Sequence, residues 1–377
     1  MPSKKKIILT GSIPPPYHGS SIFFSSLLNS RIKDEFDISH LDISDHRDLD
    51  NLSRLDLTNV KLAFSNIISL YKMLKKTDYD LVYIPVASNF LPYLRDGLFI
   101  LTASYFSKSK IVIHLHEGDY FRFGFYEKAV FPVKYFIRKS LSRVDTAIVL
   151  GENLKPVFEG LVKNIEICQN GIRKDNITGK DHKKNSGKRN IAVSYLGNLF
   201  ESKGVIDILN AAEIVLRKHN DVNFRFAGAW SQKEGKTKEI ADKIVEDKSL
   251  GDHVEFTGII TGKAKDDFLD RTDIFVFPTW YRHEGFPLVI IEAMAASCPV
   301  ISTKETGAIP DIVAEGETGL LIDKKRPDLI AEAIIKLIEY PEKRKEMGEK
   351  GMERYEKFFT LDTCIERMIG VFNKVLN

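Results

Sequence analysis

The sequence predicts an α/β protein with two doubly wound parallel sheets. Short apolar runs alternate with helix-like segments through most of the chain, which is typical of parallel sheets covered by helices. A polar stretch near the middle separates two such series. The chain has 377 residues and is 43% hydrophobic and 28% charged, so each half can bury a core of its own.

The first series fills the N-terminal half. Asn170 and Gly171 then form a turn signal, and 173–189 has few apolar residues, so we predict a first domain at 1–172 and a linker at 173–189. The strands expected in the first domain are 7–10, 38–41, 81–85, 111–115, 146–150 and 165–168.

The second series predicts another domain, at 190–355. Each series resembles a Rossmann-like domain, and ligands of doubly wound sheets bind outside the carboxyl ends of the strands. Two such domains that face one another would therefore form a ligand cleft between them. The strands expected in the second domain are 192–196, 223–227, 253–256, 274–277, 300–302 and 320–322.

Composition narrows the class of protein. The three cysteines, Cys168, Cys298 and Cys364, lie far apart and show no disulfide or metal spacing, which favours a reducing compartment. The apolar run at 7–10 is too short for a signal peptide, and the longest one, 97–106, is too short to cross a bilayer. We therefore expect a cytoplasmic protein with no transmembrane helix.

Charge is distributed unevenly along the chain. Residues 1–190 carry a net charge of +9 and the remainder −6, so the basic half is expected to meet something anionic. The segment 120–139 combines aromatic and basic residues that suit the headgroup layer of a membrane; aromatic residues in the core with Lys and Arg in solvent are the alternative. With a pI of about 8.5 and no binding motif, nucleic acid is not expected as a partner.

The most informative motif is the run from Glu284 to Glu292, which places two carboxylates eight positions apart. Phe286 and Pro287 break any preceding strand, and 288–296 then reads as a mostly buried helix with Pro287 at its first position. The free N–H groups at that helix start favour phosphate or hydroxyl oxygens, and Glu292 can accept from both hydroxyls of a ribose. Two solvated glutamates beside a buried helix are the alternative.

Two further loops carry candidate binding residues. Lys203 follows a strand and precedes a helix, where its charge can neutralise a diphosphate, although a solvent-facing surface lysine is the alternative. Gly19 lies in the loop after the first strand, where a glycine permits close approach of the backbone to a ligand. The alternative is a proline-stiffened turn that ends in an ordinary serine cap.

A pair of histidines ends the strand at 111–115. His114 and His116 alternate with Leu115, so both should point to the same side, near Glu117 and Asp119. The cluster lacks a recognisable third and fourth ligand for a transition metal, and a core histidine with a satisfied hydrogen bond is the usual alternative.

The order of these motifs closely resembles the retaining glycosyltransferases of family 4, which are group 1 glycosyltransferases with the GT-B fold. Glu284 and Glu292 form the E-x7-E motif of that family. The resemblance implies two Rossmann-like domains that face an interdomain cleft, with a closing helix at 356–377 that packs back on the first domain. It covers the whole chain, is strongest from 191 to 321, and rests also on 273–284, 298–303, 307–311 and 316–321.

The resemblance also implies roles for individual residues. Lys203 would neutralise the diphosphate, Glu292 would bind the ribose, and His116 would contact the sugar near the anomeric carbon. The residues expected to bind the donor are Gly19, Asn198, Lys203, Glu284, Gly285, Phe286, Pro287 and Glu292, with His116, Glu284 and Lys203 as the catalytic set.

This sequence departs from the family pattern at three positions. Asn198 replaces the Arg that precedes the family's phosphate-binding lysine, which removes one cation, and Arg282 is a candidate substitute. His18 replaces the first of two glycines, and Ser297 replaces a glycine before the Cys298-Pro-Val strand, which we expect to alter a turn and not the chemistry.

We therefore expect a retaining hexosyltransferase that uses a UDP- or GDP-sugar and a glycan or polyprenyl-linked lipid acceptor, in the synthesis of cell-surface polysaccharide or glycolipid. It would act in the cytoplasm or at the cytoplasmic face of the membrane. No cofactor or metal is expected, because both D-x-D patterns, at 48–50 and 78–80, have local explanations in a turn and at a strand start. The alternatives are a phosphorylase or epimerase of this fold, and a non-catalytic glycan- or lipid-binding protein with a decayed donor site.

Overall fold

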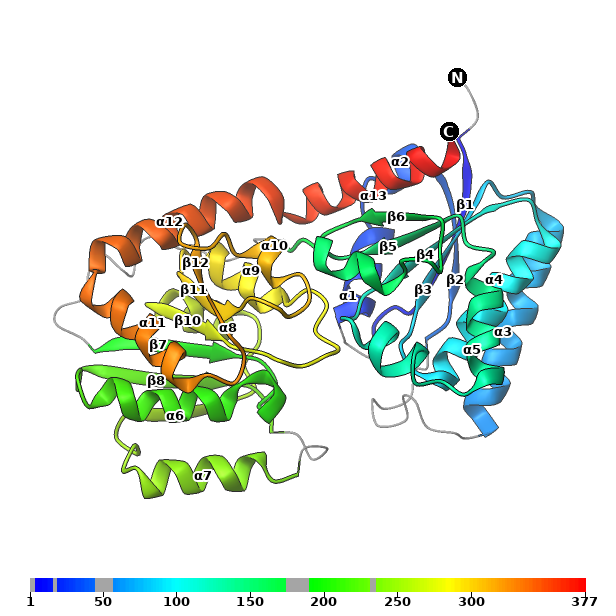
Figure 1. Cartoon of the computed structure of the whole chain (residues 1–377). Coiled ribbons are helices and arrows are strands. Elements are labelled where there is room, and N and C mark those ends of the chain that lie inside the picture. The colour runs from blue at the N-terminus through cyan, green and yellow to red at the C-terminus, as the bar shows by residue number, and fades with distance from the viewer. Residues whose placement is uncertain (1–3, 16–18, 45–56, 174–189, 231–234) are drawn as a thin grey trace. The chain divides into compact units, whose positions relative to one another are not determined.

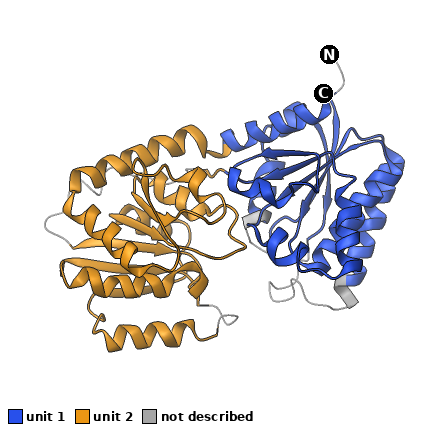
Figure 2. Ribbon diagram, in the orientation of Figure 1, with its two compact units in different colours: residues 1–170, 362–377 blue, residues 171–361 orange. Residues whose placement is uncertain are grey.

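The computed structural model describes residues 4–15, 19–44, 57–173, 190–230 and 235–377. The chain divides into two compact units, unit 1 with residues 1–170 and 362–377, and unit 2 with residues 171–361 (Figure 2). In each unit a parallel six-stranded sheet is covered by helices (Figure 1). The predicted fold class, two Rossmann-like doubly wound domains, is confirmed.

Unit 1 has the strand order β2-β1-β3-β4-β5-β6. Its strands are β1 (Lys6–Gly11), β2 (Asp37–Asp42), β3 (Leu81–Val86), β4 (Lys110–Leu115), β5 (Thr146–Val149) and β6 (Asn164–Ile167). Its helices are α1 (Gly19–Leu28), α2 (Ile32–Glu35), α3 (Leu57–Lys76), α4 (Phe90–Phe106), η2 (Phe121–Tyr126), α5 (Phe131–Leu141), η3 (Glu152–Val157) and the last helix of the chain, α13 (Leu361–Leu376).

Unit 2 has the strand order β12-β11-β10-β7-β8-β9. Its strands are β7 (Ile191–Leu196), β8 (Val222–Ala227), β9 (Val254–Gly258), β10 (Ile274–Phe277), β11 (Val300–Thr303) and β12 (Gly319–Ile322). Its helices are η5 (Glu201–Lys203), α6 (Val205–Leu216), α7 (Thr237–Asp247), α8 (Lys263–Asp270), α9 (Leu288–Ala295), α10 (Ile309–Ile312), α11 (Pro327–Glu339) and α12 (Pro341–Phe358).

Strand order fixes where each sheet can bind a ligand. In unit 1 the chain passes from β1 outward to β2 and then returns to β3, and in unit 2 it passes from β7 through β8 to β9 and returns to β10. The neighbours β1 and β3, and likewise β7 and β10, therefore flank a point where successive connections run in opposite directions. Ligands of such sheets bind at this switch point, outside the carboxyl ends of the strands.

Aspartates tie the opposite, amino ends of the strands together. Asp80 precedes β3 and accepts hydrogen bonds from the Lys6 backbone N–H at 2.8 Å and from Lys5 Nζ at 2.9 Å. Asp145 accepts from the Ile111 N–H, and Asp273 does the same for the start of β7. The pattern at 78–80 thus has the structural explanation expected from the sequence, and the pattern at 48–50 lies outside the described residues.

From the sequence, the helix that packs on unit 1 is expected to begin at residue 356. In the structure this helix, α13, begins at Leu361. Ile172 forms a backbone bridge beside Thr360: its N–H donates to the Phe359 carbonyl at 3.0 Å, and its carbonyl accepts from the Leu361 N–H at 2.9 Å. This bridge separates α12 from α13. In unit 1 the Cys168 thiol then contacts the Cys364 carbonyl at 3.8 Å, which joins α13 to the end of β6.

Across the described residues, no helix combines the length and the apolar character needed to cross a bilayer. The three cysteines are reduced and buried.

Candidate active site

The switch point of unit 2 brings together the loops that follow β7 and β10. Gly204 has a left-handed φ of 85°, and a Cβ there would lie 2.7 Å from the Pro278 carbonyl oxygen. The backbone N–H of Trp280 donates to the Ser202 carbonyl at 2.9 Å. Glycine at position 204 therefore allows the lysine-bearing loop to lie directly against the glutamate-bearing loop.

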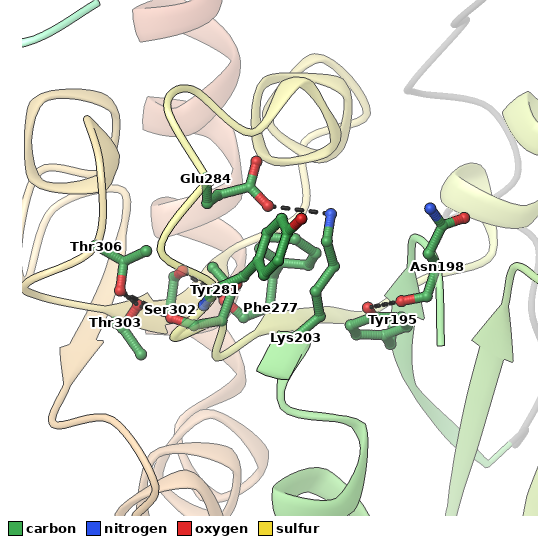
Figure 3. Close-up of polar contacts among 10 residues, drawn as sticks. Tyr195, Asn198, Lys203, Phe277, Tyr281, Glu284, Ser302, Thr303 and Thr306 are labelled. Atoms are coloured by element: carbon green, nitrogen blue, oxygen red, sulfur yellow. Dashed lines mark hydrogen bonds and ion pairs between the residues drawn. The ribbon is translucent and has the colours of Figure 1, made fainter. Parts of the chain in front are cut away.

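Lys203 and Glu284 form an ion pair across these loops (Figure 3). Lys203 Nζ lies 3.1 Å from Glu284 Oε2, and the two side chains are only 17% and 12% exposed. The ammonium also lies 5.7 Å from the centre of the Phe277 ring and 5.6 Å from that of Tyr281. Two aromatic rings and a carboxylate thus hold a positive charge at the switch point.

The pair is close but poorly aligned. Glu284 Oε2 is buried and makes no hydrogen bond of good geometry to any described residue. A carboxylate in this state can accept from a ligand hydroxyl without giving up an established hydrogen bond. The arrangement therefore suits a ligand that carries both negative charge and hydroxyl groups.

Buried hydroxyls fix the backbone that leads to Glu284. Thr303 and Thr306 both donate to the Thr279 carbonyl, at 2.7 and 2.9 Å, and Ser302 donates to the Phe277 carbonyl at 2.6 Å (Figure 3). Ser302 and Thr303 are the last two residues of β11, and Thr306 lies in the loop that follows. The neighbouring strand thereby sets the direction in which the β10 loop leaves the sheet.

The backbone of the glutamate loop is also clamped from the other side. The Ala308 N–H donates to the Gly285 carbonyl at 2.8 Å. Gly307 has a φ of 52°, and a Cβ at this position would lie 2.2 Å from the Glu284 carbonyl oxygen. A side chain at 307 would displace the loop that carries Glu284, Gly285 and Phe286.

The helix after this loop, α9, begins at Leu288 as predicted, but the placement of Pro287 at its first position is wrong. Pro287 has an extended ψ of 105° and precedes the helix, so it does not occupy the first helical position. Glu292 lies inside α9, is 15% exposed, and its Oε1 accepts a 2.8 Å hydrogen bond from Lys265 of α8. Both acids of the motif are therefore paired with a lysine.

Asn198 contributes its backbone, since its carbonyl accepts a hydrogen bond from the Tyr195 hydroxyl at 2.8 Å (Figure 3). Its side chain is exposed, as is Arg282 in the β10 loop. The proposal that Arg282 replaces the family arginine stays a prediction.

Unit 1 places a different group of side chains at the end of β4. The rings of His114 and His116 lie 3.9 Å apart, so the prediction that both point to one side is correct. The Tyr83 hydroxyl, from β3, lies 2.9 Å from His114 Nδ1 and 3.4 Å from His116 Nε2. Phe23 of α1 covers both imidazoles.

Burial decides how these groups carry their protons. His114 is fully buried, and burial together with the neighbouring His116 holds its pKa well below the usual value of 6.5, so it is neutral. Its Nε2 makes no hydrogen bond to any described residue. A buried N–H without an acceptor costs more than an unused lone pair, so we place the His114 proton on Nδ1, where it donates to Tyr83. The Tyr83 hydroxyl then donates to His116 Nε2, and the His116 proton lies on Nδ1.

The remaining candidates occupy the same end of unit 1. Gly19 is the first residue of α1, and His18 lies outside the described residues. Glu117 and Asp119 are partly buried after β4. Within the described ranges, no three His, Cys, Asp or Glu side chains gather as a metal ion would require.

Comparison with known proteins relates the C-terminal half of the chain to a family. Residues 177–354 match the family model for glycosyl transferases group 1. The chain carries a group 1 glycosyltransferase domain. It is 27% identical over 380 residues to an uncharacterised glycosyltransferase of Methanocaldococcus jannaschii, with 98% of each chain covered. It is also 30% identical to a capsular polysaccharide biosynthesis glycosyltransferase of Staphylococcus aureus, over 50% of this chain and 47% of that one.

Solved structures agree with the GT-B fold of this glycosyltransferase. Sucrose-phosphate synthase from Thermosynechococcus elongatus superimposes with a TM-score of 0.75 at 17% identity and covers 99% of both chains. HepE of Anabaena, in a complex with UDP, superimposes with a TM-score of 0.69 at 15% identity, over 98% of this chain and 100% of that one.

Sequence reasoning missed two partners of the glycosyltransferase site. Lys265 lies 27 positions before Glu292 and Tyr83 lies 33 positions before His116, so no local motif links them. A signal for Tyr83 exists only after the sheet order is known, because β3 and β4 are then neighbours and Tyr83 pairs with Val112. Neither pairing could be derived from spacing alone.

Proposed function

We propose that this glycosyltransferase moves a hexose from a UDP- or GDP-sugar to a glycan or lipid-linked acceptor, with retention of the anomeric configuration, in the synthesis of cell-surface polysaccharide or glycolipid. The observation that carries the proposal is the Lys203–Glu284 pair at the switch point of unit 2. A nucleoside diphosphate sugar has an anionic diphosphate and a ring of hydroxyls, and this pair offers one partner for each.

Lys203 stabilises the leaving group in this proposal. Negative charge builds on the diphosphate as the bond to the anomeric carbon breaks, and a cation fixed between the rings of Phe277 and Tyr281 needs no reorganisation to meet it. Glu284 turns from Lys203 to the sugar hydroxyls, while the N–H groups at the start of α9 add partial positive charge. Glu292 accepts from the ribose hydroxyls.

His116 acts from unit 1. With its proton on Nδ1 and its Nε2 held by Tyr83, its ring is fixed as a hydrogen-bond donor that can position a hydroxyl of the sugar without adding a positive charge to the site. The acceptor hydroxyl attacks on the face that the diphosphate leaves and gives its proton to the departing phosphate oxygen, which gives retention. Acceptor contacts come from unit 1, and the protein works at the cytoplasmic face of the membrane.

We further propose that the reaction needs no metal or cofactor. The carboxylates of the motif, Glu284 and Glu292, are each paired with a lysine and are therefore poorly placed to collect a divalent cation. Activity that is unchanged by EDTA would support this proposal, and activity restored only by Mg²⁺ or Mn²⁺ would contradict it.

The direct test is a nucleotide-release screen over UDP-, GDP- and ADP-sugars, with and without membrane extract. We expect release with one nucleotide, stimulated by extract, and abolished in Glu284→Gln. Lys238→Met, which removes an exposed ion pair with Asp242 on α7, is the matched control and should keep full activity. Silence across the panel would overturn the proposal, and release that requires inorganic phosphate would indicate a phosphorylase.

A further inference from the structure

The outer helical layer of unit 1 has an unusual surface. Helix α4 packs between α3 and α5, and the three cover one face of the sheet (Figure 1). We call their outward side, with the flanking Val130 and Arg143, the α3–α5 surface. Its exposed large apolar side chains are Val60, Phe64, Ile68, Tyr71, Phe90, Leu94, Tyr105, Phe106, Val130, Phe131 and Tyr135.

These apolar residues are ordered along the helices. On α3, Val60, Phe64 and Ile68 follow one another at intervals of four residues and are 55%, 65% and 40% exposed. A stripe at this spacing normally faces a core, and here it faces away from the sheet. At the start of α5, Phe131 is 81% exposed and stacks with Tyr135. Many exposed large apolar side chains on one helical layer are typical of an interaction site.

The same surface is almost purely cationic. The three helices contain a single acid, Asp96, which is fully buried and paired with Arg95. Their basic residues are Lys61, Lys72, Lys75, Lys76, Arg95, Lys134, Arg138 and Lys139. A partner of this surface must therefore accept both apolar side chains and positive charge.

Cations and rings are interleaved on this surface. Lys75 lies over the rings of Tyr71 and Phe106, at 6.0 and 5.6 Å from their centres, and those two rings meet edge to face at 4.8 Å. Arg143 lies 5.4 Å from the centre of the Tyr105 ring. Side chains arranged in this way can place rings at an interface while their charged ends stay at headgroup depth.

We propose that the α3–α5 surface docks on an anionic lipid bilayer. A second copy of the chain is disfavoured because it would bring two acid-free cationic surfaces together. A nucleic acid would match the lysines, yet it offers nothing to Val60, Ile68 or Val130, whereas the boundary between headgroups and acyl chains accepts both kinds of side chain. The surface deepens the membrane part of the proposed function and uses no donor-site residue, so the two can fail separately.

Vesicle flotation with the full chain tests the proposal. We expect binding to vesicles of phosphatidylcholine and phosphatidylglycerol that weakens as salt rises, and little binding to phosphatidylcholine alone. Phe131→Ser with Tyr135→Ser should weaken binding at least about tenfold, and Lys72→Glu with Lys76→Glu should do the same. None of these residues belongs to the donor site, so nucleotide release without vesicles should be unchanged.

Two control variants in unit 2 match these changes. Ile259→Ser removes an apolar side chain that is 74% exposed, and Lys343→Glu with Lys345→Glu reverses two exposed charges on α12. Both should bind vesicles like the parent chain. The proposal is overturned if the parent ignores anionic vesicles, if neutral vesicles bind equally, or if the controls lose as much binding. It is also overturned if the α3 and α5 variants instead abolish a concentration-dependent dimer.

Discussion

The two units of this chain differ in the chemistry that they place near the carboxyl ends of their strands. In unit 2 the loops after β7 and β10 carry a charged pair, Lys203 and Glu284, held between aromatic rings. In unit 1 a neutral relay joins Tyr83, within β3, to His114 in β4 and His116 just after β4. One doubly wound plan thus holds a charged pair in unit 2 and a neutral hydrogen-bonded group in unit 1, and under the proposed function these would meet the diphosphate and the sugar hydroxyls.

The difference has a physical cause in the residues that surround each site. At the unit 2 switch point, side-chain hydroxyls and close glycine contacts shape the backbone of two loops, which hold the charged side chains against each other with little exposure. In unit 1 His114 lies within β4 and beside Phe23, where burial disfavours charge on its ring. Loops therefore carry charge, and the strand end carries the neutral hydrogen bonds.

The largest expected effect is the loss of the charged pair. Lys203→Met removes the cation that meets the leaving diphosphate, so turnover should fall by about 10²- to 10³-fold. The turnover of Glu284→Gln should fall by a similar factor, because a neutral amide binds sugar hydroxyls less strongly than a carboxylate does. The measurement is kcat for nucleotide release with the responding donor, after circular dichroism has confirmed that the variants fold. Retention of more than a tenth of the activity by both would break the comparison, because the charge would then be dispensable.

Glu292 tests whether the second acid binds the nucleotide. Glu292→Ala should raise the Kd for the free nucleotide about tenfold to a hundredfold, as expected for hydrogen bonds to a charged group, with little change in acceptor affinity. Lys265→Met should have a smaller effect, because Glu292 keeps both oxygens. Titration calorimetry measures both. A larger effect from Lys265 than from Glu292 would show that the lysine, and not the acid, contacts the ligand.

Tyr83 tests the neutral relay of unit 1. Tyr83→Phe removes the hydroxyl that holds His116 Nε2, so turnover should fall about tenfold, in line with loss of one orienting hydrogen bond. The nitrogen-15 shifts of His116 should change from one neutral tautomer to a mixture of both. Tyr79→Phe, which loses a 3.0 Å hydrogen bond to Ser39 in the same unit, is the matched control and should alter neither. Unchanged shifts in Tyr83→Phe would contradict the proton assignment.

The position of these sites was far easier to predict than their partners. Each predicted strand is present, because buried parallel strands are short apolar runs that a single sequence displays clearly. Glu284, Lys203 and His116 each lie in the segment that follows a strand, and that position is also local information. Lys265 and Tyr83 act through the packing of neighbouring elements, and Pro287 was misplaced by one residue because ψ at a helix start depends on the loop before it.

Low pH should distinguish the two units by stability. Burial depresses the pKa of His114 in the folded state. The free energy of unfolding of unit 1 is therefore at its full value above the unfolded pKa of 6.5. It falls as the pH drops below 6.5, by up to ~1.4 kcal/mol per pH unit, because only the unfolded chain then binds the proton. Hydrogen exchange of the β4 amides between pH 7.5 and 5.5 measures it. His114→Phe should flatten that dependence, and an unaltered slope would assign the effect to another group.

Tryptophan fluorescence can follow unit 2 separately, because both tryptophans, Trp230 and Trp280, lie there. The smallest expected effect concerns Ser297, which follows α9 with a left-handed φ of 55°. A glycine adopts this conformation without strain, so Ser297→Gly should raise the free energy of unfolding of unit 2 by about 0.5–1 kcal/mol.

Ser297→Ala keeps the strained Cβ and serves as the control, with no gain expected. Gly348 of α12 approaches closely here, since a Cβ on it would lie 2.2 Å from the Ser297 carbonyl oxygen, so the turn cannot relax by moving away. Nucleotide release should be equal in all three proteins, because the turn lies at the far end of α9 from Glu284. A stabilised variant with altered turnover would show that the donor site of unit 2 depends on this turn, and the contrast with unit 1 would then extend from charge to backbone strain.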